Sequence, residues 1–275
     1  DILADMSVEF IEENQQNPFF LTLAHFDVHV QLDADKDLID KFLNKEKKDN
    51  YPGNAVYAAM VEHVDKTVGR VEAKLGELGL EENTIVIFSS DNGPWISYGN
   101  HAGTTPFREA KGTTFDGGTR SATIIKYPAE LKGNQESAKT IMTIDILPTL
   151  CNLANVPLPK TEIDGKNVWD LIAGKEGAIN PHDYYAFTNS SNLEAVMSGD
   201  GKWKLHLPHN YRTMTDIEGK DGLPGKYRQE KIELSLFDMQ NDPFETTNVL
   251  HENTEIAEKL LDFAKAHRAQ FFAEK

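Results

Sequence analysis

Residues 84–95 read TIVIFSSDNGPW, and this stretch carries the strongest indication of the fold. The apolar run 85–88 is typical of a strand buried on both faces, as in a parallel sheet. It ends at Asp91 and Asn92, and open parallel sheets bind ligands beyond the carboxyl ends of their strands. Carboxylate and amide oxygens suit Ca²⁺ or Mg²⁺. The stretch therefore predicts either part of a cation site or a turn held by Asx hydrogen bonds.

The segments upstream predict a strand–helix–strand unit. Residues 3–14 have the spacing of a short amphipathic helix, and the apolar run 19–26 (FFLTLAHF) has the length of a buried strand. Apolar positions recur at helical spacing over 52–79, and Gly79 is a suitable C-terminal stop. We expect a βαβ unit with parallel strands. The charge-dense segment 36–50 is expected to be a solvated helix or loop.

Downstream, the pattern changes twice. A glycine-rich loop over 92–118 leads into an expected strand and an expected helix, SATIIKYP and TIMTIDILPTLCNLAN. Short strand-like segments then follow one another without intervening helices, and the chain ends in a helix pattern over 254–272. This order predicts a small antiparallel sheet with a helix packed on it. We therefore expect an α/β unit over 1–180 and a small α+β unit over 181–275.

The composition excludes some partners. The chain has 28 Lys plus Arg against 44 Asp plus Glu, a net charge of −16. Such a chain should not bind nucleic acid or anionic membrane through its general field, and an anionic substrate would need a local cationic cluster. Cys151 stands alone, so no internal disulfide forms, and its apolar helical setting predicts a core position. No apolar run is long enough to span a membrane, and no signal peptide is visible.

Two groups of polar residues could meet at the sheet edge. His25, Asp27 and His29 follow the first expected strand, at the same rim as the Asp-Asn pair. The glycine-rich loop adds four basic residues, His101, Arg108, Lys111 and Arg120. A lysine beside a cation can hold an oxyanion, and the alternative for each basic residue is an ordinary surface position.

Five segments together resemble the arylsulfatase-type sulfatases of the alkaline phosphatase-like superfamily. They are GELGLEENTIVIFSSDNGPWISYGNHAG, FREAKGTTFDGGTRSATIIKYPAELKG, IDILPTLCNLANVPLPKTEIDGKNVWDLI, GKWKLH and LFDMQNDPFETTNV. The likeness covers essentially the whole chain in the family's order. It implies an α/β/α sandwich, of which the large domain is partial here, followed by a small C-terminal domain with an antiparallel sheet and a helix.

The resemblance assigns roles to individual residues. Asp91 and Asn92 resemble two Ca²⁺ ligands, and Lys111 resembles the lysine that holds the sulfate group. His29 resembles the histidine that contacts sulfate and protonates the leaving oxygen; it stands in Val-His-Val-Gln, where many members have Pro-His-x-Pro. The family's Glu-Gly-Gly is Asp-Gly-Gly here. Substrate contacts are expected from the long loop and the small domain, namely from His101, Arg108, Trp95, Tyr98, His206 and His209.

One family feature is absent from these 275 residues. Sulfatases use a formylglycine nucleophile made from Cys or Ser in a Cys/Ser-x-Pro-x-Arg motif, and no such motif occurs here. Cys151 is followed by Asn-Leu-Ala-Asn, and TTPFR at 104–108 has Thr in first place. The acidic pair that would complete the Ca²⁺ site is also missing. We expect the C-terminal portion of a sulfatase, inactive alone, binding Ca²⁺ weakly, and needing either an N-terminal half or self-association.

Alternatives remain open at this point. A phosphodiesterase or phosphonate hydrolase of the same superfamily would also have a metal site at the edge of the sheet. A degenerate, non-catalytic binding protein is the alternative from another class. For the favoured reading, the expected substrate is a small sulfate ester or a sulfated carbohydrate, and resemblance to bacterial sulfatases implies a periplasmic or secreted full-length protein.

Overall fold

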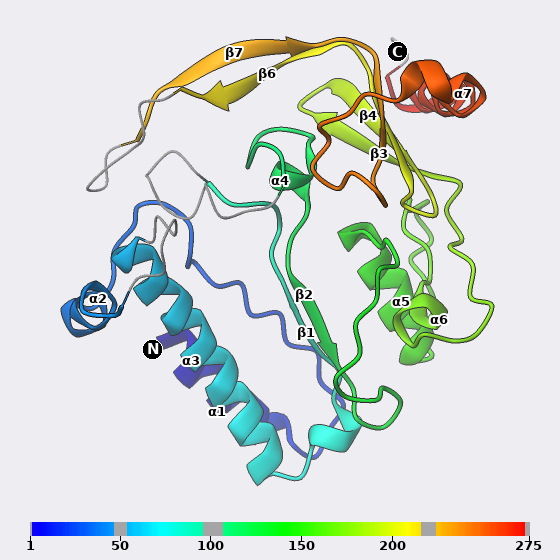
Figure 1. The fold of residues 1–275 in the computed structure, drawn as a ribbon. Helices are drawn as coiled ribbons and strands as arrows, with labels where there is room; N and C mark the ends of the chain where they lie inside the picture. The colour runs from blue at the N-terminus through cyan, green and yellow to red at the C-terminus, as the bar shows by residue number, and fades with distance from the viewer. Residues whose placement is uncertain (1, 47–53, 96–106, 216–223, 273–275) are drawn as a thin grey trace.

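The computed structural model describes residues 2–46, 54–95, 107–215 and 224–272 (Figure 1). Three helices form its N-terminal part: α1 (Ile2–Asn14), α2 (Lys36–Leu43) and α3 (Ala55–Glu77). The long helix α3 packs against both of the others. The expected helices over 3–14 and 52–79 are thus confirmed, and the charged segment after residue 36 contributes a short exposed helix.

Helix α3 begins and ends as its sequence predicts. The side chain of Asn54 accepts a hydrogen bond from the backbone N–H of Tyr57 at 3.0 Å, which caps the first turn. At the other end, the N–H of Leu80 donates to the carbonyl of Leu75 at 2.8 Å. Gly79 lies between them with φ of +68°, so this C-terminus is a Schellman motif that favours glycine.

The expected parallel βαβ unit is wrong for the described residues. After a 3₁₀ turn, η1 (Glu81–Asn83), strand β1 (Val86–Ser89) forms and pairs antiparallel with β2 (Thr123–Lys126). Residues 18–26 are assigned no strand and leave Phe20 and Phe26 75% and 81% exposed. A strand exists only where a neighbour completes its hydrogen-bond ladder, and no described segment pairs with this apolar run.

The middle of the chain includes a buried carboxylate that binds three separate segments. It contains α4 (Asp116–Thr119), η3 (Thr143–Asp145), α5 (Ile146–Leu153) and α6 (Trp169–Ile172). The carboxylate of Asp145 is 1% exposed and accepts hydrogen bonds from the backbone N–H groups of residues 142 and 166. It also lies 2.6 Å from a ring nitrogen of residue 182. The helix expected here is shortened at its start by the 3₁₀ turn, and its Cys151 is half-buried rather than in the core.

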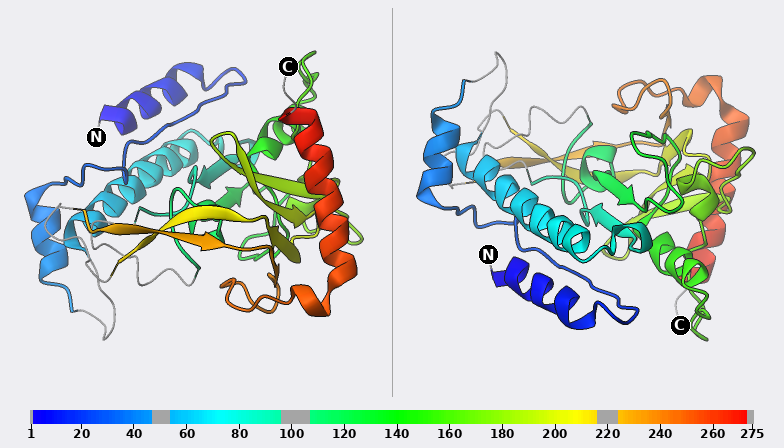
Figure 2. Two further views of the ribbon diagram at one scale, coloured as in Figure 1. Left: turned by 90° about the horizontal axis from the view of Figure 1, so that it is seen from above. Right: turned by 90° about the horizontal axis from the view of Figure 1, so that it is seen from below.

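The C-terminal part is an antiparallel sheet covered by a helix, as expected. The strand order is β3 (Tyr184–Asn189), β4 (Asn192–Ser198), β5 (Trp203–His206) and β8 (Ser235–Asp238). Helix α7 (Thr254–Phe271) follows the short turn η4 and packs on one face of this sheet (Figures 1 and 2). Its contact is a core of aliphatic side chains, namely Leu193, Val196, Leu205, Leu207, Leu236, Ala257, Leu260 and Ala264.

A separate hairpin was not predicted from the sequence. Strands β6 (His209–Met214) and β7 (Tyr227–Ile232) pair antiparallel and extend above the segment that carries α4 (Figures 1 and 2). The ring of Tyr211 meets that of Phe115 at a centroid distance of 4.9 Å. Strand β3 was also missed. The hairpin therefore covers the glycine-rich loop with residues that lie about a hundred positions further along the chain.

Candidate active site

The end of β1 and the lysine loop are joined by backbone hydrogen bonds. The N–H of Gly93 donates to the carbonyl of Gly118 at 2.9 Å, and the N–H of Lys111 donates to the carbonyl of Pro94 at 3.0 Å. The residues that directly follow Asp91 and Asn92 therefore lie against the loop that carries Lys111, and the metal-binding and sulfate-holding roles of these three residues remain predictions. We call this contact between residues 93–94 and the lysine loop the joint. Its hydrogen bonds are made by main-chain groups, so its geometry depends on how closely the two backbones approach.

Glycines make that close approach possible. A Cβ on Gly93 would overlap the carbonyl oxygen of Gly117, and a Cβ on Gly117 would overlap the carbonyls of residues 108 and 109. A Cβ on Gly118 would overlap the carbonyl of Thr113. The Asp-Asn-Gly and Asp-Gly-Gly motifs thus need glycine because no side chain fits between the packed backbones.

The expected metal ligands offer oxygens of the right kind in a small number. Asp91 is exposed, and Asn92 is half-buried with its Nδ2 donating to the carbonyl of Gly93 at 2.7 Å. That bond leaves the Oδ1 of Asn92 without a partner among the described residues. Hard oxygen donors fit Ca²⁺, which takes six to eight ligands. In the described ranges, no three His, Cys, Asp or Glu residues gather as a metal set, so these two residues fit as part of a larger site.

Lys111 is half-buried, with its Nζ 5.8 Å from the ring centroid of Trp95. Within the described ranges, no carboxylate forms an ion pair with this ammonium. A lysine ammonium near a cation site can hold one oxygen of an anion while the bound cation holds another.

Arg108 is used inside the protein. One Nη donates to the carbonyl of Glu245 at 2.8 Å and the other donates to the hydroxyl of Tyr211 at 3.0 Å. Its guanidinium also lies over the ring of Phe115 at 4.3 Å. A contact between Arg108 and substrate stays a prediction, as does that of His101, which lies with Tyr98 outside the described residues. Arg120 pairs at 3.5 Å with the carboxylate at the start of α4.

The predicted histidine is not brought to the lysine by any described contact. His29 is exposed, and its Nδ1 lies 2.9 Å from the carbonyl of Val30. The alternative, His25, contacts the hydroxyl of Thr67 on α3 at 3.3 Å. Its Nδ1 also lies 3.9 Å from the carboxylate of Asp27. The position of His29 relative to a bound sulfate therefore remains a prediction.

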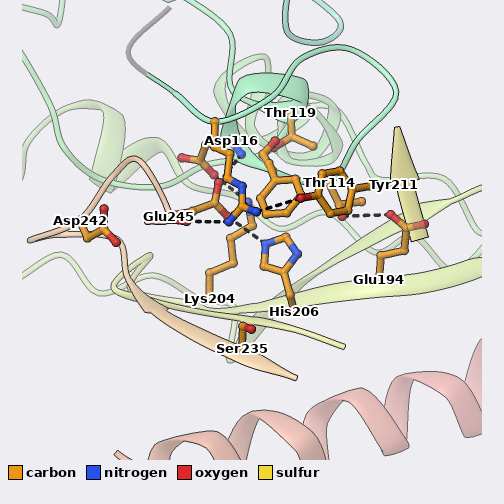
Figure 3. A network of polar contacts seen from close by, with 12 residues as sticks. Thr114, Asp116, Thr119, Glu194, Lys204, His206, Tyr211, Ser235, Asp242 and Glu245 are labelled. Carbon is orange, nitrogen blue, oxygen red and sulfur yellow. Dashed lines mark hydrogen bonds and ion pairs between the residues drawn. The ribbon is translucent and has the colours of Figure 1, made fainter. Parts of the chain in front are cut away.

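Behind the loop lies a buried ionic network that the sequence did not reveal (Figure 3). The ammonium of Lys204, which is fully buried, lies 2.8 Å from the carboxylate of Asp116 and 3.1 Å from that of Glu245. The other carboxylate oxygen of Glu245 accepts the backbone N–H of Asp116 at 2.7 Å. His206 completes the set, with its Nε2 2.8 Å from Glu245. The start of α4 is thus bound by Lys204 of the C-terminal sheet and by Glu245 in the segment after it, and His206 supports Glu245.

The charge state of the network follows from its burial and its partners. Burial alone raises the pKa of Glu245, but the charge of Lys204 and the hydrogen bond from His206 outweigh it and hold that pKa at about 2. Burial lowers the pKa of His206 to about 4. At neutral pH the imidazole is therefore uncharged, and its Nε2–H donates to the ionised Glu245. The ring stacks on that of Phe115 at 4.5 Å.

The expectation that His206 and His209 line a substrate pocket is wrong. They are 0% and 6% exposed, and His209 lies 3.6 Å from the carboxylate of Glu194. Glu194 in turn accepts a hydrogen bond from Thr114 at 3.0 Å. One signal in the sequence could have pointed to this network, because a lysine stands between two apolar residues in the strand segment GKWKLH.

Two family models match the chain. The model described as Sulfatase matches residues 1–156, and the model described as N-sulphoglucosamine sulphohydrolase, C-terminal, matches residues 110–221. Within the described residues, no helix is long and apolar enough to cross a bilayer.

Curated relatives match over nearly the whole chain. A sulfatase from Formosa agariphila is 32% identical over 96% of this chain and 48% of its own length. An N-acetylgalactosamine-6-O-sulfatase from Bacteroides thetaiotaomicron is 29% identical, over 97% of this chain and 50% of its own length. Human arylsulfatase A is 26% identical over 91% and 46%. The chain thus spans about half the length of these relatives.

Solved structures share the fold. A chain described with the metabolism of multiple glycosaminoglycans by Bacteroides thetaiotaomicron matches with a TM-score of 0.73 and 26% identity, over 98% of this chain and 54% of that one. The PsFucS1 sulfatase from Pseudoalteromonas sp. matches with a TM-score of 0.74 and 25% identity, over 98% and 52%. The observed helices and antiparallel sheets therefore belong to an alkaline phosphatase-like α/β fold.

Proposed function

Because the chain belongs to the sulfatase family, we propose that it supplies the sulfate-holding lysine and part of the cation site of a hydrolase that splits sulfate esters into alcohol and sulfate. The proposal rests mainly on the joint between residues 93–94 and the lysine loop. Backbone hydrogen bonds join Gly93 and Pro94, which directly follow Asp91 and Asn92, to the loop that carries Lys111. The Lys111 ammonium has no carboxylate partner among the described residues.

Each residue would act on a different part of the ester. The ammonium of Lys111 would bind a sulfate oxygen and orient the group, and this contact strengthens as charge develops on the oxygens. Asp91 and Asn92 would hold Ca²⁺, which polarises a sulfate oxygen when bound. His29 would deliver a proton to the leaving alcohol oxygen, because an alkoxide is a poor leaving group at neutral pH.

The nucleophile and the remaining metal ligands are proposed to come from outside these 275 residues. Exposed apolar side chains support a covering partner, since Ile124 on β2 is 64% exposed and Phe26 is 81% exposed. We propose that this chain alone does not turn over an aryl sulfate, and that its isolated Ca²⁺ affinity is weaker than micromolar.

The substrate class is proposed to be a sulfated carbohydrate. The matched relative from Bacteroides thetaiotaomicron is named for N-acetylgalactosamine 6-sulfate, and a saccharide offers hydroxyl leaving groups of the kind that His29 would protonate. A periplasmic or secreted location of the full-length protein fits this class and remains a proposal.

Calorimetric titration with N-acetylgalactosamine 6-sulfate tests the role of Lys111. Hydrogen bonds to charged groups contribute about 1.5–3 kcal/mol, so Lys111→Gln should weaken binding about ten-fold or more. The matched control is Lys231→Gln, which removes one positive charge from an exposed ion pair with Glu233. Equal affinity for Lys111→Gln and wild type would overturn the proposal. Tighter binding of the corresponding phosphate ester than of the sulfate ester would favour the phosphodiesterase alternative.

A further inference from the structure

A second cation is built into the surface next to Lys111. Strand β6 directs Tyr211 into the core, so the next residue, Arg212, points to the opposite face of the hairpin. There its Nη2 lies 3.4 Å from the carbonyl of Lys111. The hairpin therefore delivers an arginine to the same loop that carries the proposed sulfate-holding lysine.

Two aromatic rings and one glycine fix the position of this arginine. The guanidinium carbon lies 4.5 Å from the ring centroid of Tyr227 and 5.0 Å from that of Trp95. A guanidinium near aromatic faces is pre-organised and loses little further freedom when it binds an anion. Gly112, with φ of +89°, leaves it room, because a Cβ there would come within 2.8 Å of Nη2 of Arg212.

The charge of Arg212 is not neutralised by the part of the chain that the structure describes. No carboxylate in those ranges pairs with Arg212 or with Lys111. Their situation differs from that of Lys74 and Lys204, whose ammonium groups have acidic partners. The acidic side chain of the loop itself, Glu109, instead forms a hydrogen bond with Thr213.

Lys111 and Arg212, which have no carboxylate partner among the described residues, lie at a distance that one ligand can span. Each is within 6 Å of the same Trp95 ring, so their separation cannot exceed the sum of these two distances. Two sulfate groups on one sugar, or on two linked sugars, lie within such a span. A planar guanidinium offers a fork of N–H donors that matches sulfate oxygens in pairs.

We propose that Arg212, held by Trp95 and Tyr227, is a specificity-determining residue that binds a second sulfate group on the sugar whose target sulfate is held by Lys111. This inference rests on the proposed sulfatase function and names its preferred substrate as a multiply sulfated saccharide. The arginine would touch substrate and leave the reacting atoms to other groups.

The test compares two ligands on the 275-residue chain by calorimetry: N-acetylgalactosamine 6-sulfate and N-acetylgalactosamine 4,6-disulfate. The wild-type chain should bind the disulfate about ten-fold more tightly, the value of one additional charge-assisted interaction. Arg212→Gln should remove this preference and leave affinity for the monosulfate nearly unchanged. Arg212→Lys should retain part of the preference, because a lysine keeps the charge but lacks the fork. The control Lys231→Gln, on the same hairpin, should keep all of it.

Each result separates this inference from the proposed function. If Lys111→Gln weakens both ligands while Arg212→Gln leaves the disulfate preference intact, the second subsite is overturned and the proposed function survives. If Lys231→Gln reduces the preference as much as Arg212→Gln, the preference is a general field effect and the subsite is again overturned. If neither ligand shows saturable binding at millimolar concentration, or Lys111→Gln changes nothing, both proposals fall.

Discussion

The molecule contains two lysines, Lys204 and Lys111, that differ in whether acidic side chains neutralise their charge. At Lys204, burial is complete and two carboxylates neutralise the ammonium. At Lys111, the side chain is half-buried, and the described part of the chain provides no acidic partner. A buried charge that is neutralised by carboxylates contributes to structure, whereas a charge without an acidic partner can bind an anionic ligand. The two sites are adjacent in space, since the network of Lys204 holds the turn that follows the loop of Lys111.

The largest expected effect is on stability and comes from the buried site. Lys204→Met should lower the free energy of unfolding by about 3–5 kcal/mol, because it leaves buried carboxylates without their cation. Lys111→Gln should change it by less than about 0.5 kcal/mol, as surface substitutions do. Urea denaturation of both variants measures this difference. Similar losses in the two variants would break the distinction between a structural and a functional lysine.

A double variant shows whether the loss of stability comes from the direct interaction between Lys204 and Glu245. Glu245→Gln in the Lys204→Met background removes one of the stranded charges. The combined loss should be smaller than the sum of the single losses, because the two residues interact directly at 3.1 Å. Additive losses would mean that the network acts through packing alone.

The next effect is a pH dependence that belongs to the buried site. The folded pKa of His206 is about 4 against 6.5, and that of Glu245 is about 2 against 4.5. Both folded values are depressed, so below each unfolded value the unfolded chain binds more protons. Stability is thus full above about pH 6.5 and falls on acidification, first through His206 and then through Glu245, by roughly 3 kcal/mol for each group over its whole range.

Thermal unfolding between pH 7 and pH 3 checks this order. The variant His206→Gln keeps an N–H donor but cannot titrate, so its stability should be flat between pH 6.5 and pH 4.5 after correction for other groups. A wild-type curve that is flat in the same interval would contradict the depressed pKa of His206.

The smallest effect separates two glycines. Gly93→Ala should cost about 1–3 kcal/mol, because its Cβ would overlap the carbonyl of Gly117 and force the two backbones apart. It should also weaken binding of N-acetylgalactosamine 6-sulfate. Gly69→Ala is the matched control within α3, where the Cβ meets nothing within 4 Å; it should stabilise by up to about 1 kcal/mol. Equal effects of the two substitutions would show that the joint tolerates a side chain.

The sequence predicted those elements whose signals are local. Helix α3 has its periodicity, its Asn54 cap and Gly79, and the small sheet has strand-length apolar segments. The strand expected over 19–26 failed because pairing depends on a neighbour rather than on apolarity. The hairpin β6–β7 was missed because its strands carry many polar residues, such as those of YRQEKI.

In the candidate site, too, features with a local sequence signal were predicted and features that depend on distant partners were not. Motif resemblance pointed to Lys111 and to residues 91–92, and backbone hydrogen bonds join the two residues after 91–92 to the loop that carries the lysine. The partners of Lys204 and of Arg212 could not be derived, because they are distant in sequence and neither spacing nor composition links them. His206 was assigned to a pocket because a histidine near a proposed site suggests chemistry, whereas burial and its Glu245 partner make it structural.

The contacts that hold the start of α4 affect the order in which the protein folds. Asp116 is bound by residues 88 and 129 positions later, and Arg108 by a carbonyl 137 positions later. Contacts of such sequence separation form late, because closing long loops is slow. During synthesis, a nascent chain that has emerged only as far as β5 already contains Lys111, Lys204 and His206, but not Glu245, which accepts the backbone N–H of Asp116. The lysine loop therefore acquires its final shape near the end of folding, after the C-terminal sheet has assembled.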